Sequence, residues 1–482
     1  MGPVLNFGIT PPERGSRTLF RSLHSQLRAS IFDGRLKPGL RLPATRTFAK
    51  TYGVSRNTAV AIYDLLTSEG YLVTRQTAGT FVADVLPPFA AHVSPANKSE
   101  RDRRLNTWWR APRAACYRPT PQPDFDFQVG VPDQTQFPFH VWRRLSARAL
   151  RRLAKMPATY ADPSGECELR AAIVSHVSFA RAVACRPQDV TVTSGAQQGF
   201  DLLARTLVTP RRTVVAVENP GYPPACAAFA AAGARLVPIP VDEEGLIVER
   251  LPKSARIIYV TPSHQYPLGV VLSMRRRIAL LEFARTNGAV VIEDDYDGEF
   301  RFGGRPLDAL QTLDRGESVF YVGTFSKSMF PSIRIGYVVA PPWARDALAA
   351  AKQLTDWHTA VPTQHALAEF IAEGHLACHV RKVHRMYDER RKILLRCLET
   401  HFASLLTMIP SMAGLHLTTL FERPVDAEAL VQKARDTDIG INSLRRFFVG
   451  RPTKIGLAFG YGGIDGKAIE GGLERLRPLL SR

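Results

Sequence analysis

The sequence has only six cysteines in 482 residues, and they are scattered along the chain with no CxxC pair. Closely spaced cysteines are the usual mark of a structural zinc site or a disulfide framework, so both are disfavoured. Widely spaced free thiols are instead typical of a protein that works in a reducing cytoplasm.

Long apolar stretches are also missing. No uninterrupted run approaches the roughly 20 residues that cross a bilayer. The first residues, MGPVLNFGITPPERG, lack the basic start, apolar stretch and small-residue cleavage site of a secretory leader. The chain is longer than one hydrophobic core normally serves. We therefore expect a cytoplasmic protein of two or more domains with no membrane partner.

Acidic residues are in short supply, with 44 Asp and Glu against 63 Lys and Arg, giving a formal net charge of +19. Eleven basic against four acidic residues give +7 over residues 1–83, and seven against four give +3 over 84–124. The much longer remainder has 45 against 36, or +9. Positive charge is therefore densest at the N-terminal end, as expected where a protein meets nucleic-acid phosphates.

Composition divides the chain into three regions. Residues 14–83 show helical periodicity and end in a strand-like hairpin, whereas residues 84–124 are basic and proline-containing, as a linker is. From 125 to 482, helical segments alternate with short β-branched runs: VTVTSG, TVVAVENPG, RIIYVTPS, AVVIEDD and VFYVGTFS. That alternation predicts an α/β domain on a mostly parallel sheet.

The N-terminal region has the pattern of a helix-turn-helix. Leucine or isoleucine recurs at every fourth position over 19–31, which predicts a first helix. A second helix is expected over 44–52, and Ser55 is a suitable N-cap for a third over 56–69. The residues expected on the inward face of the third helix are Val60, Tyr63, Leu65 and Leu66. Those available at its start for base edges and phosphates are Ser55, Arg56, Asn57 and Thr58.

Two strand-like stretches follow at 71–74 and 80–83, and the turn from Arg75 to Gly79 gives a wing with a basic tip. The segments GRLKPGLRLPATR, GVSRNTA and LTSEGYLVTRQTAGTFV closely resemble the GntR-type winged helix. The resemblance covers about the first 83 residues and implies binding to double-stranded operator DNA. The contacts that it implies are Arg41 and Arg46 at phosphates, Arg56, Asn57 and Thr58 in the major groove, and the turn at Gly79 near the minor groove.

Lys327 is the most informative residue of the long C-terminal region. It follows an apolar strand and a short turn, so its amine is expected at the end of the sheet, where ligands bind in open α/β sheets. Hydroxyls flank it at Thr324, Ser326 and Ser328, and Arg334 follows. This combination suits a phosphate group beside an amine.

Five carboxylates crowd the seven positions from Glu293 to Glu299, directly after an apolar strand. Oxygen ligands in such a run can bind a divalent metal. A carboxylate such as Asp294 can instead hold a pyridinium nitrogen in its protonated form. Considered without the lysine, the two interpretations carry equal weight.

Pyridoxal phosphate explains the lysine and the carboxylate together, because its chemistry needs both and a phosphate cradle as well. Ser194, Gly195 and Ala196 follow the strand VTVT and open a helix, so free N–H groups and a positive helix end are available for an anion. Such turns are common helix caps. With the lysine, the carboxylate and Arg334, however, the turn predicts a pyridoxal-phosphate site and no metal.

Six further motifs resemble fold-type I aminotransferases: YADPSGECELR, TSGAQQGFDLL, ENPGYP, TPSHQYPLG, VVIEDDYDGEFRF and GTFSKSMFPSIRIGY. They span most of residues 125–463, and their pairing with a GntR-type head resembles the MocR/GabR family of regulators. The resemblance implies an N-terminal winged helix-turn-helix joined to an aminotransferase-like α/β domain with a mostly parallel sheet. It also implies pyridoxal 5'-phosphate as cofactor and a homodimer.

The resemblance assigns roles to individual residues. Lys327 would form the internal aldimine and Asp294 would pair with the ring nitrogen. Tyr222 would stack on the ring, and Tyr296 would bond the ring hydroxyl. The other residues expected around the cofactor are Ser194, Gly195, Ala196, Thr324, Ser326 and Arg334 on the phosphate side, His264 of the family's HQ pair, and Tyr160 reaching into the partner's site.

The sequence departs from the family where an effector carboxylate would bind. Members often carry an arginine soon after the stacking tyrosine, whereas Tyr222 is followed by PPACAAFAAAGA and the next arginine is Arg235. The effector is therefore expected to differ from the γ-amino acid of the family's namesake. The second carboxylate-binding arginine is assigned to Arg451, with Arg445 and Arg446 as competing assignments.

Two functions remain open. A transcription regulator would sense an amino compound, or pyridoxal phosphate itself, through Lys327 and so control operator binding. Alternatively, an active aminotransferase would carry an accessory DNA-binding domain, because sensing and catalysis share the first chemical step. The fused head favours regulation over enzymatic turnover.

Overall fold

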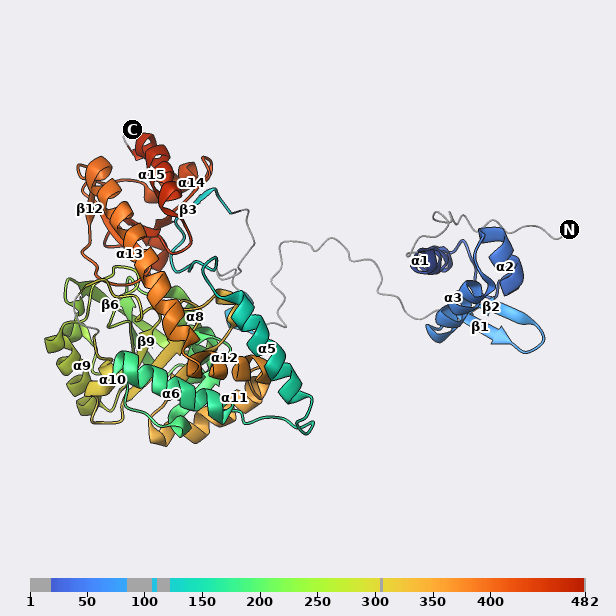
Figure 1. Ribbon diagram of the computed structural model, residues 1–482, viewed down its shortest axis with the longest axis horizontal. Coiled ribbons are helices and arrows are strands. Elements are labelled where there is room, and N and C mark those ends of the chain that lie inside the picture. Colours follow the sequence, from blue (N-terminus) through green and yellow to red (C-terminus); the bar gives the residue numbers. More distant parts are fainter. Residues whose placement is uncertain (1–18, 85–105, 111–121, 304–306, 481–482) are drawn as a thin grey trace. The chain divides into compact units, whose positions relative to one another are not determined.

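The computed structural model describes residues 19–84, 106–110, 122–303 and 307–480. The chain divides into two compact units, Met1–Pro112 and Arg113–Arg482 (Figure 1). Most of the predicted linker 84–124 lies outside the described residues, which include a short helix of it, α4 (Thr107–Arg110). Among the described helices, none is long and apolar enough to cross a membrane.

The N-terminal unit is a winged helix, as predicted. Its elements are α1 (Leu19–Phe32), α2 (Thr45–Tyr52), α3 (Arg56–Ser68), β1 (Leu72–Arg75) and β2 (Gly79–Val82). Gly53 ends α2 in the left-handed conformation (φ 65°), which turns the chain into α3. The two strands pair antiparallel, from Leu72 opposite Val82 to Arg75 opposite Gly79, and form the wing.

Helix α3 begins at Arg56, as predicted, because the Ser55 side chain accepts a hydrogen bond from the N–H of Thr58. Its inward face was predicted partly wrongly. The buried residues are Ala59, Ile62, Tyr63 and Leu66, whereas Val60 and Leu65 are only half-buried. The small Ala59 belongs to the apolar cluster that contains Leu23 and Leu27 of α1, and this packing sets the rotation of the helix.

An eight-stranded sheet forms the centre of the larger unit, in the order β4-β11-β10-β9-β8-β5-β6-β7. The strands are β4 (Val190–Thr193), β5 (Val214–Asn219), β6 (Arg235–Asp242), β7 (Gly245–Leu246), β8 (Ala255–Val260), β9 (Val290–Asp295), β10 (Val319–Thr324) and β11 (Gly336–Val339). Strands β6, β5, β8, β9 and β10 run parallel to their neighbours in this series, whereas β11 is antiparallel to β10 and to β4. The sheet is therefore mostly parallel, as predicted.

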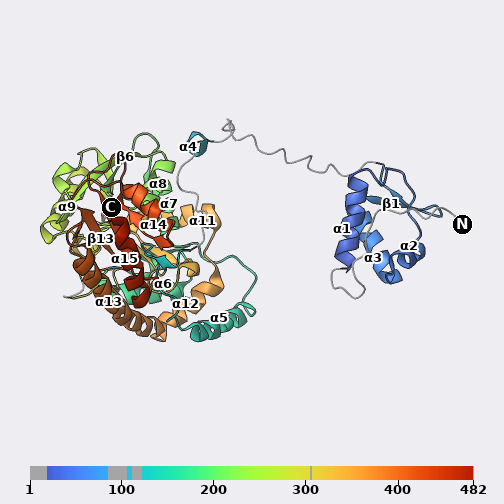
Figure 2. The same ribbon diagram turned by 90° about the horizontal axis from the view of Figure 1, so that it is seen from above.

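Helices cover both faces of this sheet (Figure 2). They are α5 (Phe139–Leu153), α6 (Cys167–Arg181), α7 (Ala196–Leu207), α8 (Pro223–Ala231), α9 (Met274–Asn287), α10 (Leu310–Leu313), α11 (Arg345–Asp356) and α12 (Val361–Ala372). The long helix α13 (His375–Phe402) follows and packs mostly with the smaller sheet described next. In β8, Tyr259 packs in the cluster of α7, α8 and α11, while Ile258 packs with α9 on the opposite face. Both faces of the strand are buried, which explains its nearly unbroken apolar sequence.

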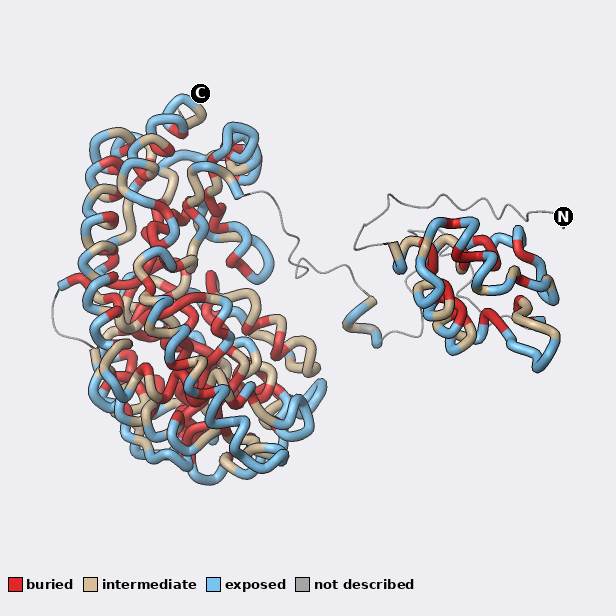
Figure 3. Tube along the Cα trace, turned by 45° about the vertical axis from the view of Figure 1, so that its right-hand side comes forward, coloured by how far each residue is buried: buried red, intermediate tan, exposed pale blue. Residues whose placement is uncertain are grey.

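A smaller sheet, in the order β12-β13-β16-β15, lies toward the C-terminus. Its strands are β12 (Leu406–Met408), β13 (His416–Phe421), β15 (Asn442–Ser443) and β16 (Gly456–Gly460), and α13, α14 (Ala427–Arg435) and α15 (Gly466–Leu480) accompany it. The short strand β3 (Phe125–Asp126) pairs with β14 (Ile439–Gly440), which ties the start of the unit to its end. Buried residues fill the interior of both units (Figure 3).

A buried ion pair secures the segment that follows β3. Arg390 of α13 donates to Asp133 at 2.5 Å and to the carbonyl of Gly462 at 2.7 Å, and its ion pair is largely shielded from solvent. The Tyr387 hydroxyl accepts a hydrogen bond from the N–H of Asp133. This segment leads directly to Gly130, which lies in the site described below.

We predict that Arg390→Ala lowers the free energy of unfolding by roughly 3–5 kcal/mol, because it leaves the Asp133 carboxylate buried without its cation. Arg205→Ala is the matched control. It breaks an exposed i,i+4 pair with Asp201 and is expected to cost at most about 1 kcal/mol. Urea titration followed by circular dichroism measures both, and equal losses in the two variants would contradict the prediction.

Candidate functional site

A cavity of ≈ 240 Å³ opens at the carboxyl ends of β9 and β10, beside the start of α7. From the strand ends and the turns that follow them it receives Asp294, Tyr296, Thr324, Ser326 and Lys327. From elsewhere in the unit come Ala196, Tyr222 and Arg334. The fold thus gathers at one end of the sheet eight of the residues that the sequence nominated for a cofactor.

Lys327 lies just beyond β10 and is partly buried. Its Nζ donates a hydrogen bond to the carbonyl oxygen of Gly130. Burial lowers the pKa of the Lys327 amine, and the neighbouring Arg334 lowers it further, although Asp297 and Asp294 oppose this shift. A larger fraction of neutral amine makes the lysine a better nucleophile.

Asp294, near the end of β9, is buried at the wall of the cavity. Its Oδ2 accepts a hydrogen bond of 2.5 Å from the Tyr259 hydroxyl, whereas its Oδ1 has no hydrogen-bond partner among the described residues. Burial raises the pKa of Asp294 to about 7, against the stabilising hydrogen bond from Tyr259. A buried carboxylate oxygen without a donor is costly, so this atom is suited to receive an N–H from a ligand.

The opposite side of the cavity is built to hold an anion. Helix α7 starts at Ala196, and its first N–H groups and positive end face this side. Arg334 donates to the Ser194 carbonyl at 2.9 Å, and a Cβ on Gly195 would come within 2.5 Å of its guanidinium. Glycine at 195 (φ 82°) therefore permits the arginine to approach the helix end. The N–H of Ser194 itself is occupied by the side-chain oxygen of Gln198 at 2.7 Å.

Three tyrosines form an aromatic wall. Tyr222 meets Tyr266 edge to face at 5.4 Å between ring centroids, and Tyr266 meets Tyr296 in the same way at 5.6 Å. Tyr222 and Tyr296 were predicted from the sequence, whereas Tyr266 was not. It stands next to the HQ pair in the motif TPSHQYPLG, and that neighbourhood was the available clue.

His264 does not line the cavity but lies behind Tyr296. Its Nδ1 is 2.8 Å from the Tyr296 hydroxyl and 2.9 Å from Asp297 Oδ2. His264, Asp297 and His416 bring possible metal-ligand atoms within 4.8 Å of one another. These residues already take part in hydrogen bonds, since His264 Nε2 lies 3.2 Å from Ser411 Oγ and His416 Nε2 2.9 Å from the Pro267 carbonyl. The cluster therefore supports the orientation of Tyr296.

The carboxylates of the 293–299 run belong to separate networks. Glu293 accepts the N–H groups of Leu310 and Gln311, and Asp295 pairs with the buried Arg181 at 2.6 Å. Only Asp294 of the run lines the cavity described here. The divergence of these side chains weakens the alternative in which the run converges on one divalent metal.

Two residues from the sequence analysis lie away from the cavity within this chain. The Tyr160 side chain is 73% exposed and packs on Trp357, with 4.4 Å between ring centroids. Arg451 is exposed as well and is not among the residues that line the cavity. Of the competing arginines, Arg446 lies over the ring of Phe447 and bonds to Asn442.

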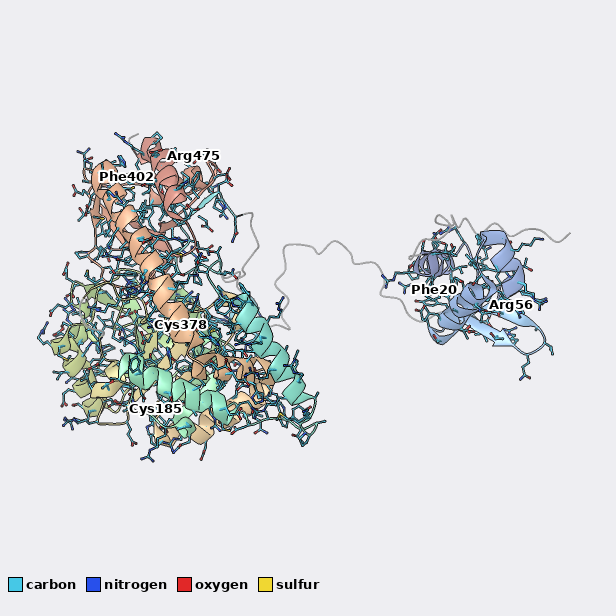
Figure 4. The ribbon with its side chains drawn as sticks, in the orientation of Figure 1. Phe20, Arg56, Cys185, Cys378, Phe402 and Arg475 are labelled. Atoms are coloured by element: carbon cyan, nitrogen blue, oxygen red, sulfur yellow. The ribbon has the colours of Figure 1, made fainter. Side chains whose placement is uncertain are left out.

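The N-terminal unit presents a second candidate surface around the start of α3. Arg56, labelled in Figure 4, and Asn57 are exposed there, while the hydroxyl of Thr58 lies 2.8 Å from Ser55 Oγ. Arg41 and Arg46 are also exposed. The N-cap hydrogen bonds thus partly occupy the side chains of Ser55 and Thr58, whereas those of Arg56 and Asn57 remain exposed.

Two further basic side chains, Arg41 and Arg75, lie at the wing. Arg41 pairs with Phe81 of β2 in an isolated bridge, and a Cβ on Gly79 would meet its Nε at 3.2 Å. Arg75 lies over the Phe81 ring at 4.9 Å and reaches Asp84 at 3.2 Å. The predicted basic tip is therefore partly neutralised by Asp84.

Comparison with known families matches each unit separately. Residues 20–82 match the model of bacterial regulatory proteins of the gntR family, and residues 123–455 match aminotransferase class I and II. The latter match covers well over half of the chain.

Several curated proteins match over nearly the whole chain. The probable rhizopine catabolism regulatory protein MocR of Rhizobium meliloti is 39% identical over 95% of this chain and 93% of its own length. The pyridoxine biosynthesis transcriptional regulator PdxR of Corynebacterium glutamicum is 32% identical, with 92% of each chain covered. The transcriptional regulator TauR of Rhodobacter capsulatus is 31% identical over 99% of both.

Solved structures match the larger unit. The kynurenine aminotransferase of Pyrococcus horikoshii, solved in complex with PMP, is 27% identical with a TM-score of 0.69 and covers 74% of this chain and 90% of its own. LysN, the α-aminoadipate aminotransferase of Thermus thermophilus, complexed with N-(5'-phosphopyridoxyl)-L-leucine, is 28% identical with a TM-score of 0.68 over 74% of this chain and 92% of its own. The chain therefore belongs to the MocR-type transcription regulators, in which a gntR-family winged helix is joined to a class I and II aminotransferase domain.

Proposed function

We propose that this regulator binds pyridoxal 5'-phosphate in the cavity of its larger unit and binds operator DNA through α3 and the wing. An amino compound, or the cofactor itself, controls the affinity for DNA. One observation carries the proposal. Lys327, the N-terminal end of α7 and an Asp294 Oδ1 without a hydrogen-bond partner among the described residues face one cavity, in a chain that also has a winged helix.

The residues present fit the cofactor at three points. Asp294 Oδ1 offers an acceptor for the protonated ring nitrogen, and the tyrosine at 222 offers a flat apolar face for the ring. The phosphate would be held by α7, the hydroxyls of Thr324 and Ser326, and Arg334. When bound, pyridoxal phosphate supplies an aldehyde that a lysine amine holds covalently and that the amine of a second compound can take over.

The chain's own groups prepare that exchange. The pKa of the Lys327 amine is lowered, so it releases its proton more readily than an exposed lysine does. Tyr296, held by His264, fixes a hydroxyl at the edge of the cavity. Arg334 and the start of α7 would hold the phosphate. An amine that fits the cavity better in one arrangement of the protein would then shift DNA binding.

An active aminotransferase is the second candidate. It is favoured by the solved relatives, which are aminotransferases with the same fold. The full-length relatives with a winged helix are instead named as regulators. Repeated turnover of an amino donor and a keto-acid acceptor would favour the enzyme. Binding of one amine without turnover, accompanied by a change in DNA affinity, would favour the regulator.

We further propose that the protein acts in the cytoplasm as a homodimer, with Tyr160 contributing to the partner's cavity. Large apolar side chains exposed along and after α5, and at the end of α11, support this. They are Leu150, Leu153, Met156, Tyr160, Leu354 and Trp357. Exposure of this many large apolar groups is the usual mark of an interface between proteins.

We predict that purified protein mixed with pyridoxal phosphate shows a visible absorption band that survives dialysis. Lys327→Ala should abolish it, because Lys327 is the one amine among the described residues that line the cavity. Lys433→Ala, at an exposed lysine of α14, is the control and should keep the band. Titration with a panel of amines then identifies the effector as the one that shifts the band stably. An unchanged spectrum in the Lys327 variant would sink the assignment.

We predict that Arg56→Ala weakens operator binding about 10-fold or more, since a good bidentate contact to a base is worth roughly 1–3 kcal/mol. Fluorescence anisotropy at fixed salt measures the affinity, with Lys433→Ala again as control. The same assay, run with and without cofactor and each amine, tests regulation. DNA affinity indifferent to all of them would refute the proposed sensing role.

We predict that Leu150→Asp, which places a charge on the exposed face of α5, shifts the protein from dimer to monomer in sedimentation velocity. Ile278→Asp on α9 introduces the same charge at a residue that is exposed to a similar degree (59% against 56%) and should leave the dimer intact. A wild-type monomer, or a dimer unaffected by Leu150→Asp, would speak against this interface.

A further inference from the structure

Tyr259 is a fully buried tyrosine in β8, and its hydroxyl donates a hydrogen bond of 2.5 Å to Asp294 Oδ2. Strands β8 and β9 run parallel with Tyr259 opposite Ile292, so the phenol extends along the sheet face toward its carboxyl end. Phe200 packs edge to face on the Tyr259 ring at 5.6 Å between centroids. Packing on the ring holds the hydroxyl in one position.

This hydrogen bond acts on both oxygens of Asp294. It occupies Oδ2, so the oxygen left for a ligand is Oδ1. It also stabilises the ionised carboxylate. Burial is the largest influence raising the pKa of Asp294, and the negative charges of Asp295, Asp297 and Glu218 raise it further. Among the largest influences on this pKa, the hydrogen bond from the Tyr259 hydroxyl is the one that lowers it.

We propose that Tyr259 is a positioning residue for the cofactor: it orients Asp294 with Oδ1 toward the ring nitrogen and keeps the carboxylate ionised, so that the nitrogen stays protonated. This inference rests on the proposed function, because it needs pyridoxal phosphate in the cavity. Tyr259 does not line the cavity and acts only through Asp294. A protonated ring nitrogen is what lets the cofactor draw electrons from the amine that it carries.

The neighbouring strand provides a matched control. Tyr321 of β10 is likewise buried, and its hydroxyl donates to Asp295 Oδ2 at 2.6 Å. Asp295, however, is also paired with Arg181 and does not line the cavity. Tyr321→Phe therefore removes the same kind of bond from the same kind of environment without touching the carboxylate that would meet the ring.

The experiment measures equilibrium affinity for two ligands, pyridoxal phosphate and its 1-deaza analogue, in which CH replaces the ring nitrogen. For Tyr259→Phe we expect pyridoxal phosphate to bind about 10-fold or more weakly, as for loss of a hydrogen bond to a charged group. Affinity for the deaza analogue should change less than about twofold, because that ligand offers Asp294 no N–H. Tyr321→Phe should leave both affinities within about twofold of wild type.

Three further measurements make the test decisive. Adding Tyr259→Phe to an Asp294→Ala background should produce no additional loss if the tyrosine acts through that carboxylate. The thermal unfolding midpoint of each apoprotein reports whether the variants fold. If Tyr259→Phe does not fold, Asp294→Asn replaces it. We then expect pyridoxal phosphate to bind more weakly and the deaza analogue to bind as before.

The outcomes separate the inference from the proposed function. Two results with Tyr259→Phe, or with Asp294→Asn in its place, would overturn the role of Tyr259 and leave the proposed cofactor site in place. One is an equal loss of affinity for both ligands, and the other is no loss of affinity for either. A wild-type protein that fails to bind pyridoxal phosphate would overturn the site and the inference together. Weakening confined to pyridoxal phosphate would support both.

Discussion

The burial of a negative charge at the end of the central sheet is the constraint on which the larger unit depends. Asp294 lies where β9 emerges between β8 and β10, with further buried carboxylates at Asp295, Asp297 and Glu218. Each of these needs a donor or cation to remain in the interior. Arg181 forms an ion pair with Asp295, and His264 lies within hydrogen-bond distance of Asp297. The Thr261 hydroxyl donates a hydrogen bond to Glu218. Among the described residues, Asp294 is the one of the four with a fully buried oxygen that has no hydrogen-bond partner, and it is the one that lines the cavity.

Much of the site was predictable from the sequence because parallel strands bring consecutive βα turns to one edge. The residues at the end of VVIEDD and just after VFYVGT had to lie together once the runs were recognised as neighbouring parallel strands. This is why Lys327 and Asp294 could be nominated together, although the choice of pyridoxal phosphate over a metal needed the chemistry of the lysine and its neighbours. Gly195 and Arg334 were found for a related reason, since a helix start after β4 and an arginine after the lysine converge on the same edge.

Other features could not be read from local patterns. Tyr259 stands in an apolar strand and looks like a core residue, and its hydroxyl gains meaning only from the register between β8 and β9. The inward face of α3 depended on which residues α1 packs against, so Val60 and Leu65 were assigned to it wrongly and Ala59 and Ile62 were missed. The cap formed by Ser55 was predictable because it is purely local. Tyr160 and Arg451 were nominated from a resemblance, and a single chain leaves both at the surface.

The electrostatics of the cavity give the proposed sensing a thermodynamic direction. A ligand that supplies a donor to Asp294 and an anion to α7 and Arg334 would satisfy these groups. Without such a ligand, the rest of the fold must offset the free-energy cost of leaving them without partners. Such a ligand stabilises the larger unit by about 2.7 kcal/mol when present at 100 times its dissociation constant. An effector amine acts on this stabilised form and alters DNA binding only to the extent that it distinguishes two arrangements of the protein. Under the proposed assignment, Tyr222 and Tyr296 would contact the cofactor ring, and Tyr266 packs edge to face on both. A change in the shape of the amine beside the ring would therefore change the packing of this aromatic wall.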